Sequence, residues 1–368
     1  MNRRPTIVIA PDSFKGTATA TQAAELLAEG VREVLPDADI TLAPMADGGE
    51  GSSEIFHGQT ITLPTTDAAG RLVEASYTFD AASGTAYIDV AAASGLPAVA
   101  SQPVPTTGDT YGTGVLIADA VSRDATRVML GLGGSATTDG GSGILTALGA
   151  VLRDRAGYAL PKGGADLINL DNVDIAELNI RAAAVEWILL TDVSSPATGP
   201  TGSAAVFGPQ KGATPAEVMR LDASLAHLCS VLGVDGTLPG MGAAGGVAIG
   251  ITWLSTLIHG SAEHIHILPG APLIARATGV EELIPTADLV ITGEGRLDSQ
   301  SFTGKVVGTL HALTAAAGTP LAVAAGIIEG SLPDDLLAVE LEPGVGVEKQ
   351  LRSAGREIAQ RMISTLQG

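Results

Sequence analysis

The sequence has few aromatic residues and almost no cysteine. Phe, Trp and Tyr together make up 3% of its 368 residues, so any core must be built from Ala, Val, Ile and Leu. The single cysteine, Cys229, excludes an intrachain disulfide and is typical of a reducing compartment. With 45% hydrophobic residues, the chain can still form sizeable cores, as two domains or one elaborated domain.

Positive charge is scarce as well. Lys and Arg number 20 against 40 Asp and Glu, which gives a net charge of −20. Such a surface repels nucleic acid and anionic lipid, so we expect neither as a partner. If the substrates are anions, basic residues inside Gly- and Asp-rich loops must neutralise them locally. This singles out Lys15, Lys211, Arg296 and Lys305.

A long uninterrupted hydrophobic run is also missing. Residues 236–262 carry no Asp, Glu, Lys or Arg, but glycines and Pro239 break the first half, and 247–258 predicts a buried helix rather than a membrane span. Residues 1–5 lead directly into a strand-like run, so we expect no secretory signal and a cytoplasmic protein. The six His residues lack metal-ligand spacing. Both a monomer and a homodimer fit the sequence.

Strands and helices alternate at both ends of the chain. Residues 6–10 and 40–43 read as strands around a helix that starts at a Thr19–Gln22 capping box. A strand at 288–292, a helix at 306–317 and a strand at 321–325 follow the same pattern near the other end. This alternation predicts a parallel α/β domain.

The middle of the chain has a different pattern. Short strands at 61–63, 72–79 and 85–90, separated by turn residues, predict an antiparallel meander. We therefore expect a second domain at 61–269, inserted into a first domain formed by 1–60 and 270–368, with 108–150 as an optional part of the first. Ligands should bind at the carboxyl ends of the strands, in a cleft between the domains that closes on them.

Two loops read Asp-Gly-Gly-x-Gly, at 47–51 and 139–143, and each follows a strand-like run. Glycine lets backbone N–H groups approach a ligand, and a following helix adds donors and a positive dipole end. The Asp offers a hard oxygen for Mg²⁺ or a proton acceptor. This combination suits phosphate chemistry, although two tight turns with solvated acids would explain either loop alone.

Other loops carry isolated charged residues. Lys15 follows the first strand in a loop that is not a Walker A motif, and Asp192 follows the strand at 186–191. Lys211 lies in a turn ahead of a helix, and the predicted loop 293–298 contains Arg296 and Asp298. Each of these could also be a solvated or salt-bridged turn residue.

Taken together, these loops resemble one family over nearly the whole chain. The segments that carry the resemblance to the bacterial glycerate kinase type 1 family are Ile9–Gly16, Met45–Gly51, Gly133–Thr137, Phe207–Ala213 and Thr292–Asp298, in the expected order. The resemblance implies a flavodoxin-like α/β domain and a second α/β domain of restriction-endonuclease-like topology inserted in it. It also implies ATP-dependent phosphorylation of D-glycerate, at the 2-hydroxyl.

Phosphoryl transfer needs positioning, a metal ion and cations for the phosphate charge, and the loops suggest residues for each task. Asp192 and Asp298 are candidates for Mg²⁺ ligands, and either is also a candidate base. Lys15 and Lys211 would neutralise phosphate, Arg296 would grip the glycerate carboxylate through its two-pronged geometry, and Asp47 would orient the acceptor hydroxyl. The cofactor-binding loop would hold an anionic group through backbone N–H donors and consists of Gly133, Gly134, Ser135 and Thr137.

Three alternatives remain open from the sequence. The enzyme could phosphorylate the 3-hydroxyl or a related small hydroxy acid. A phosphatase could use the same magnesium-binding parts, and a non-catalytic protein could bind a small acid in the same cleft. Acidic residues at several loop ends argue against the binding protein, because an anion would not need them.

We predict that Lys15→Ala lowers kcat/KM by ~10²-fold or more, equivalent to ~3 kcal/mol of charge stabilisation in a closed site. The thermal unfolding midpoint should change little, because a loop lysine contributes little to folding. Steady-state kinetics and a melting curve on the same preparation test both statements. Near-normal kinetics would leave Lys15 as a solvated turn residue.

Overall fold

The computed structural model describes residues 4–333 and 336–367, and the chain divides into two compact units. The first unit comprises Met1–Asp47 and Pro269–Gly368, and the second comprises Gly48–Leu268. The second unit therefore starts earlier than residue 61, and it includes 108–150. The amides of Gly51 and Ser53 donate to the Asp89 carboxylate at 3.0 and 3.2 Å, which ties the start of the insertion to a strand of the second unit.

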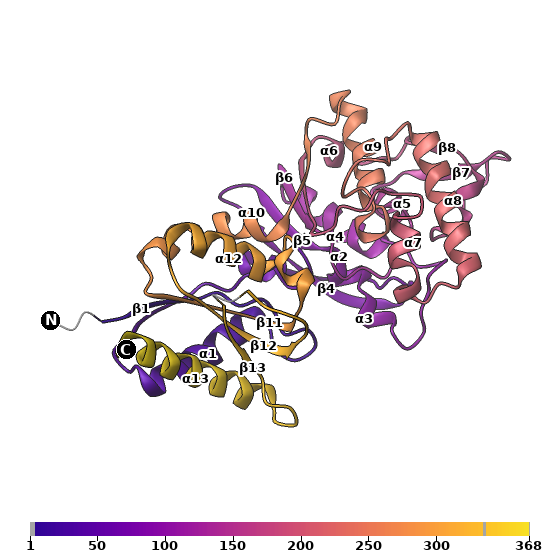
Figure 1. Cartoon of the computed structure of the whole chain (residues 1–368). Coiled ribbons are helices and arrows are strands. Elements are labelled where there is room, and N and C mark those ends of the chain that lie inside the picture. The colour runs from indigo at the N-terminus through magenta and orange to yellow at the C-terminus, as the bar shows by residue number, and fades with distance from the viewer. Residues whose placement is uncertain (1–3, 334–335, 368) are drawn as a thin grey trace. The chain divides into compact units, whose positions relative to one another are not determined.

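The first unit is built on a five-stranded parallel sheet with the order β2-β1-β11-β12-β13 (Figure 1). Counted within this unit, the order is 2-1-3-4-5, which is the flavodoxin-like arrangement that the resemblance implied. The strands are β1 (Thr6–Ile9), β2 (Asp39–Leu42), β11 (Leu289–Leu297), β12 (Leu321–Ile328) and β13 (Leu337–Glu340).

Helices cover both faces of this sheet. In Figure 1, α1 and α13 lie along one face, and α10 and α12 lie along the other. The helices of the first unit are α1 (Ala20–Val34), α10 (Gly270–Ala277), α11 (Val280–Leu283), α12 (Val306–Ala317) and α13 (Val347–Gln367), with short 3-10 turns η5 (Ile284–Thr286) and η6 (Ser299–Phe302). The predicted parallel α/β domain is thus confirmed.

The first helix forms where the sequence predicts it. Thr19 accepts a hydrogen bond from the Gln22 amide, and the Gln22 side chain returns one to Thr19, so the expected capping box is present. The apolar side chains of α1, such as Leu27, pack in a core shared with β1, β11 and α13. α1 and α13 approach each other through glycines, because a Cβ at Gly30 would overlap the carbonyl oxygen of Arg352 and one at Gly355 that of Leu27.

The segment 293–298 corrects one prediction. We expected a loop after residue 292, but β11 continues in extended form to Leu297. β12 is long enough to pair with it, with Glu294 opposite Ala325 and Arg296 opposite Ile327. Pairing with a neighbouring strand outweighs the turn tendency of the two glycines. As a result, Glu294 is buried and Arg296 is exposed.

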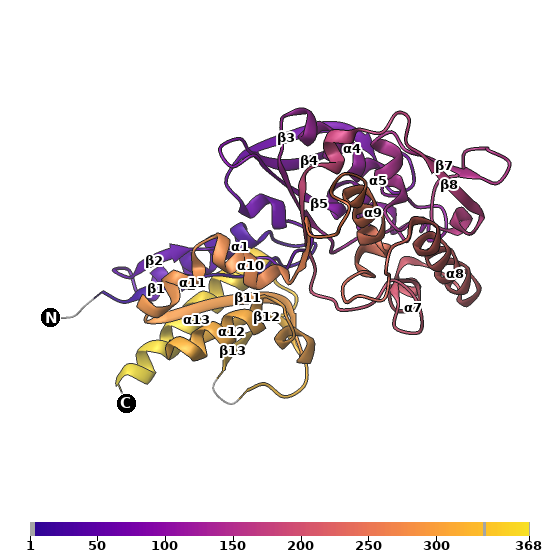
Figure 2. The ribbon, with the colours of Figure 1, turned by 90° about the horizontal axis from the view of Figure 1, so that it is seen from above.

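The second unit has a mixed six-stranded sheet with the order β10-β9-β6-β5-β4-β3. β10, β9, β6 and β5 run parallel, whereas β4 and β3 complete the predicted antiparallel meander at the sheet edge seen in Figure 2. The strands are β3 (Gln59–Thr66), β4 (Leu72–Asp80), β5 (Thr85–Asp89), β6 (Arg127–Gly131), β9 (Glu186–Leu190) and β10 (Ile265–Leu268), and a separate hairpin-like pair is formed by β7 (Val151–Asp154) and β8 (Leu170–Asp174).

Several of the second unit's helices are short. The α-helices are α2 (Val90–Ser94), α3 (Leu96–Val99), α4 (Tyr111–Ser122), α5 (Ser142–Ala147), α6 (Ile180–Ala183), α7 (Ser203–Phe207), α8 (Pro215–Leu232) and α9 (Val247–His259). The 3-10 turns are η1 (Ser52–Ile55), η2 (Ala165–Asn169), η3 (Pro209–Lys211) and η4 (Ala243–Gly245). α9 contributes Val247, Ile251 and Leu254 to the large apolar core, as expected for a buried helix.

We predict that Gly30→Ala destabilises the first unit by about 1–3 kcal/mol, because the methyl group would push α13 away from α1. Alanine's higher helix propensity, worth ~1 kcal/mol, would offset only part of this effect. Urea unfolding measures the difference. Gly295→Ala is the matched control in the same unit, because its φ is not positive and no atom lies within 4 Å of the new Cβ. Equal stability of both variants would contradict close helix packing at Gly30.

Candidate functional site

Three carboxylate residues lie where three adjacent strands of the first unit end. Asp12 follows β1, Asp47 follows β2, and Glu294 lies in the last part of β11. The backbone fixes Asp12 directly, because its amide donates to the Gly293 carbonyl at 2.8 Å. The Met45 amide donates to the Pro11 carbonyl at 2.9 Å, which draws the segment after β2 to the same edge. This edge includes the point at which the strand order reverses, the usual ligand position in such sheets.

Burial dominates the acid–base behaviour of this cluster. It raises the pKa of Asp12 to about 7; Asp47 and Glu294 raise it further, whereas the Ser13 amide and Lys15 oppose the shift. Burial likewise raises the pKa of Glu294 to about 7, opposed by Ser301 and Lys305. Sequence reasoning missed both residues as site candidates. Asp12 was visible in a post-strand loop, but the burial of Glu294 depends on the continuation of β11.

The basic candidates of the first unit lie on its surface. Lys15 is exposed. Arg296 is 57% exposed, and its Nη1 is 3.1 Å from both carboxylate oxygens of Glu329. Arg296 can therefore meet a ligand carboxylate only by exchanging it for this surface partner, which exposed pairs do easily.

Asp298 has a local structural task. It precedes η6, where its Oδ1 accepts a hydrogen bond from the Gln300 amide at 2.7 Å and its own amide donates to Ser301 Oγ at 3.0 Å. The carboxylate thus caps a short 3-10 turn. A ligand would have to compete with these capping bonds for the carboxylate.

The second unit has a pocket where β6 and β9 end. Candidates from three separate loops line it: the glycine-rich segment after β6 contributes Gly133, Gly134 and Ser135, the loop after β9 contributes Asp192, and η3 contributes Lys211. Asp192 is partly exposed there. These predicted residues are therefore brought together within one unit.

Lys211 is 4% exposed, which is unusual for lysine. Its Nζ donates to Ser135 Oγ at 3.0 Å and to the Thr137 carbonyl at 2.6 Å. Burial lowers the pKa of this amine to about 8, and the negative charge of Asp139 partly offsets that effect. A protonated amine has three donors, so one is left for a ligand.

The backbone donors of the glycine-rich segment are divided between the fold and the pocket. The Gly133 amide donates to the Gly48 carbonyl at 3.1 Å, and the Ala136 amide donates to the Ser94 carbonyl at 2.8 Å. Within the described residues, the amides of Gly134 and Ser135 have no hydrogen-bond partner. Two amides next to a buried ammonium group provide donors for an anion.

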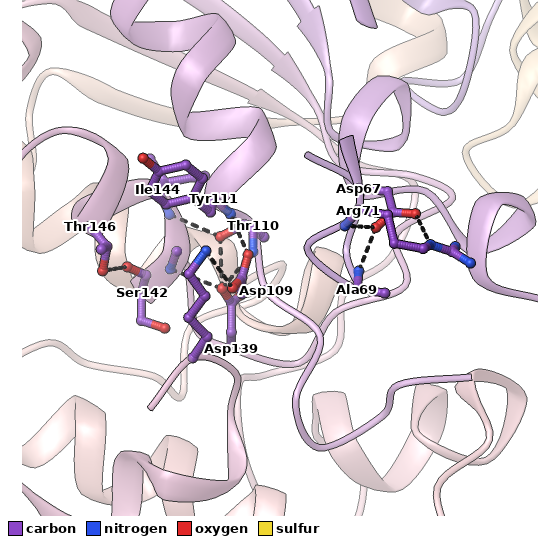
Figure 3. A network of polar contacts seen from close by, with 12 residues as sticks. Asp67, Ala69, Arg71, Asp109, Thr110, Tyr111, Asp139, Ser142, Ile144 and Thr146 are labelled. Atoms are coloured by element: carbon purple, nitrogen blue, oxygen red, sulfur yellow. Dashed lines mark hydrogen bonds and ion pairs between the residues drawn. The ribbon is translucent and has the colours of Figure 1, made fainter. Parts of the chain in front are cut away.

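The second Asp-Gly-Gly loop is structural. Asp139 is fully buried, and its carboxylate accepts hydrogen bonds from the amides of Thr110, Gly141 and Gly143 at 2.9–3.2 Å and from Thr110 Oγ1 at 2.8 Å (Figure 3). These bonds anchor the starts of α4 and α5 to each other. Its carboxylate is therefore occupied within the fold, in contrast to the expected ligand role.

No compact metal centre is built into the parts of the chain that the structure describes, since no three His, Cys, Asp or Glu side chains are grouped to hold an ion. Asp192 lies in the second unit and Asp298 in the first. A Mg²⁺ ion that arrives with a nucleotide needs only one or two carboxylates plus phosphate oxygens. Single carboxylates at loop ends fit that mode of binding.

Fold and site together define an α/β enzyme with a flavodoxin-like unit, an inserted mixed-sheet unit and a pocket equipped for anions. The chain belongs to the glycerate kinase family, whose family model matches residues 7–360, and it is accordingly a kinase with ATP as phosphate donor. It is 41% identical over 312 residues to glycerate 2-kinase of Escherichia coli, covering 82% of this chain and 79% of that protein.

Other relatives agree with this assignment. The glycerate kinase of Halalkalibacterium halodurans is 40% identical over 311 residues, covering 82% of this chain and 80% of the relative. A crystal structure from Salmonella typhimurium LT2, provisionally named glycerate kinase 2, superposes with a TM-score of 0.83 at 35% identity and covers 100% of both chains. None of the helices described here is both long and apolar enough to cross a membrane.

We predict that Lys211→Met weakens ATP binding by about 10- to 100-fold at pH 7, the range expected for a lost charge-assisted hydrogen bond of ~1.5–3 kcal/mol. For the unmodified protein, affinity should fall as the pH rises through about 8, because the amine then loses its proton. Lys211→Met should lack this pH dependence.

Isothermal titration calorimetry at several pH values measures both effects. Lys162→Met is the matched control, because Lys162 is an exposed lysine of the same unit that packs over Tyr111 and does not line this pocket. Unchanged ATP affinity for Lys211→Met would exclude Lys211 from the phosphate site.

Proposed function

We propose that the protein transfers the γ-phosphoryl group of ATP to D-glycerate, at the 2-hydroxyl, to give 2-phosphoglycerate. Membership of the glycerate kinase family supports glycerate as substrate, and the name of the Escherichia coli relative supports position 2. The observation that carries the proposal is the pocket of the second unit. There the buried Lys211 ammonium lies beside two amides that have no hydrogen-bond partner among the residues that the structure describes. In a chain with a net charge of −20, Lys211 has no carboxylate at hydrogen-bond distance in the described part of the chain, and an anionic ligand best explains such a buried amine.

We assign the nucleotide phosphates to this pocket. Gly134 and Ser135 would contribute backbone N–H donors, and Lys211 would contribute the positive charge. Gly133 and Thr137 act differently: the Gly133 amide and the Thr137 carbonyl are already bound within the fold, so they shape the loop. Burial makes the charge of Lys211 more effective than that of an exposed lysine, because solvent does not screen it.

We assign glycerate to the residues of the first unit. Arg296 would bind the glycerate carboxylate in place of Glu329, and Asp47 would orient the acceptor hydroxyl. Lys15, at the exposed end of the same loop as Asp12, would attract the anionic substrates. These roles rest on the position of the residues at the carboxyl edge of the parallel sheet.

Such a transfer would use Mg²⁺, which would neutralise the charge of the phosphates. Asp192 is the better of the two ligand candidates. It lines the same pocket as Lys211, whereas Asp298 already uses one oxygen to cap η6. Asp192→Asn should therefore raise the Mg²⁺ concentration needed for half-maximal activity more than Asp298→Asn does.

³¹P NMR of a reaction with D-glycerate, ATP and Mg²⁺ tests the proposed function. We expect one new phosphomonoester resonance that matches 2-phosphoglycerate, accompanied by stoichiometric ADP. A resonance of 3-phosphoglycerate would move the transfer to the other hydroxyl. Release of inorganic phosphate from phosphoglycerate without nucleotide would favour a phosphatase, and binding of D-glycerate without turnover would favour a binding protein.

A further inference from the structure

The first unit holds a carboxylate cluster that the roles above do not use fully. Asp12, Asp47 and Glu294 come from the ends of three adjacent parallel strands, and backbone hydrogen bonds from Asp12 to Gly293 and from Met45 to Pro11 hold those ends together. Each pair among the three carboxylates repels electrostatically. The charge of Lys15 acts on Asp12 and that of Lys305 on Glu294, whereas Asp298 adds a further negative charge that acts on Glu294.

Glu294 shows that this arrangement is not simply structural. Its side chain is 8% exposed, and within the described residues its Oε1 has no hydrogen-bond partner. Leaving a buried carboxylate oxygen unpaired is unfavourable by about 1–3 kcal/mol or more. Two other buried carboxylates, those of Asp89 and Asp139, do accept hydrogen bonds.

The cluster is better suited to a proton than to a metal ion. Its side chains do not form a group placed to hold a cation. Because Asp12 and Glu294 repel each other and Glu294 is buried, these two carboxylates are not both fully charged near neutral pH. Asp12 is partly exposed, whereas Glu294 is buried. The pKa of both groups is raised to about 7, which is the range that favours a general base.

We propose that Asp12 is the catalytic residue that accepts the proton of the glycerate hydroxyl, and that Glu294 is a positioning residue that acts through Asp12. The O–H bond breaks and its proton passes to an Asp12 carboxylate oxygen. The hydroxyl oxygen uses the freed electron pair to bond the γ-phosphorus, and the bond from phosphorus to the bridging oxygen breaks as ADP leaves with that pair. Asp12 then releases its proton to solvent. This assignment rests on the proposed kinase function.

Substitution and pH profiles test the assignment. Asp12→Asn should lower kcat by about 10²- to 10⁴-fold, the usual contribution of a general base, with little change in KM for ATP. The kcat of the unmodified enzyme should fall below pH 7 as Asp12 becomes protonated. Glu294→Gln removes a negative neighbour of Asp12, so the acidic limb of the kcat–pH profile should move to lower pH. The plateau value of kcat should stay within several-fold of that of the unmodified enzyme. Asp39→Asn, an exposed carboxylate at the opposite end of the same sheet, is the control and should change neither quantity.

The pH dependence of the unfolding midpoint distinguishes Asp12 from a carboxylate that stabilises the fold. The folded protein holds the Asp12 proton up to about pH 7, while an unfolded Asp loses it near 3.8. The folded state therefore binds more protons across that interval, and this carboxylate destabilises the fold progressively as the pH rises through it. Asp12→Asn should thus raise the unfolding midpoint relative to the unmodified protein at pH 7, and the gain should shrink toward pH 4.

The outcomes separate this assignment from the proposed function. An Asp12→Asn enzyme that retains near-normal kcat, or a Glu294→Gln profile that does not move, overturns the assignment while leaving the kinase activity established. A lower midpoint for Asp12→Asn at pH 7 also overturns it, since Asp12 would then stabilise the fold. If the unmodified protein transfers no phosphoryl group to D-glycerate or another hydroxy acid, the proposed function fails and the proton transfer fails with it.

Discussion

The pairing of β1 with both β2 and β11 is the interaction on which the first unit depends. β1 has only four residues, yet it brings the beginning of the chain into register with a strand near residue 290. Such a contact between distant segments forms only after a large loop has closed, and the second unit is that loop. The insertion starts a few residues after β2, so Asp47 belongs to the first unit and Gly48 to the second. Burial of Ile7 and Ile9 against α1 and α13 offsets the entropy cost of closing this loop.

The same pairing determines where charged groups meet. Parallel strands end at one edge, and the strand order reverses between β1 and β11, so loops from both sides converge there. In the second unit, side chains likewise gather at the carboxyl ends of parallel strands, because the segments after β6 and β9 carry residues that line the Lys211 pocket. One unit thus concentrates negative side chains and the other a buried positive one. Phosphoryl transfer requires both kinds of group, a base or metal ligand and a cation for the phosphates.

Local patterns in the sequence were sufficient for most helices and strands. The capping box at Thr19 and the meander at β3–β5 depend on neighbours within a few residues, and both are confirmed. The prediction for the length of β11 was wrong, because the glycine-rich segment 293–297 becomes a strand only when β12 lies beside it. Pairing of this kind involves residues distant in sequence, which composition and periodicity do not reveal.

The site illustrates the same limit. The sequence singles out five residues because each follows a strand or stands before a helix, and the structure brings them together. The residues Gly133, Gly134, Ser135, Asp192 and Lys211 line one pocket. Their catalytic roles stay predictions. Which amides in the glycine-rich segment are available to a ligand could not be read from the sequence, because Gly48 and Ser94 occupy two of them from other parts of the chain.

Two loops with the same Asp-Gly-Gly-x-Gly sequence show why burial must be known before a role is assigned. Asp139 is enclosed and receives donors from three amides and a hydroxyl, so its charge stabilises the junction of α4 and α5. Asp47 lies instead beside Asp12 and Glu294, where negative charges repel one another. Asp139, whose role is structural, is therefore supplied with hydrogen-bond donors. Within the described residues, Glu294 Oε1 has no donor at the edge where a parallel sheet binds its ligands. Protonation of the cluster lowers the repulsion there, as do the charges of Lys15 and Lys305.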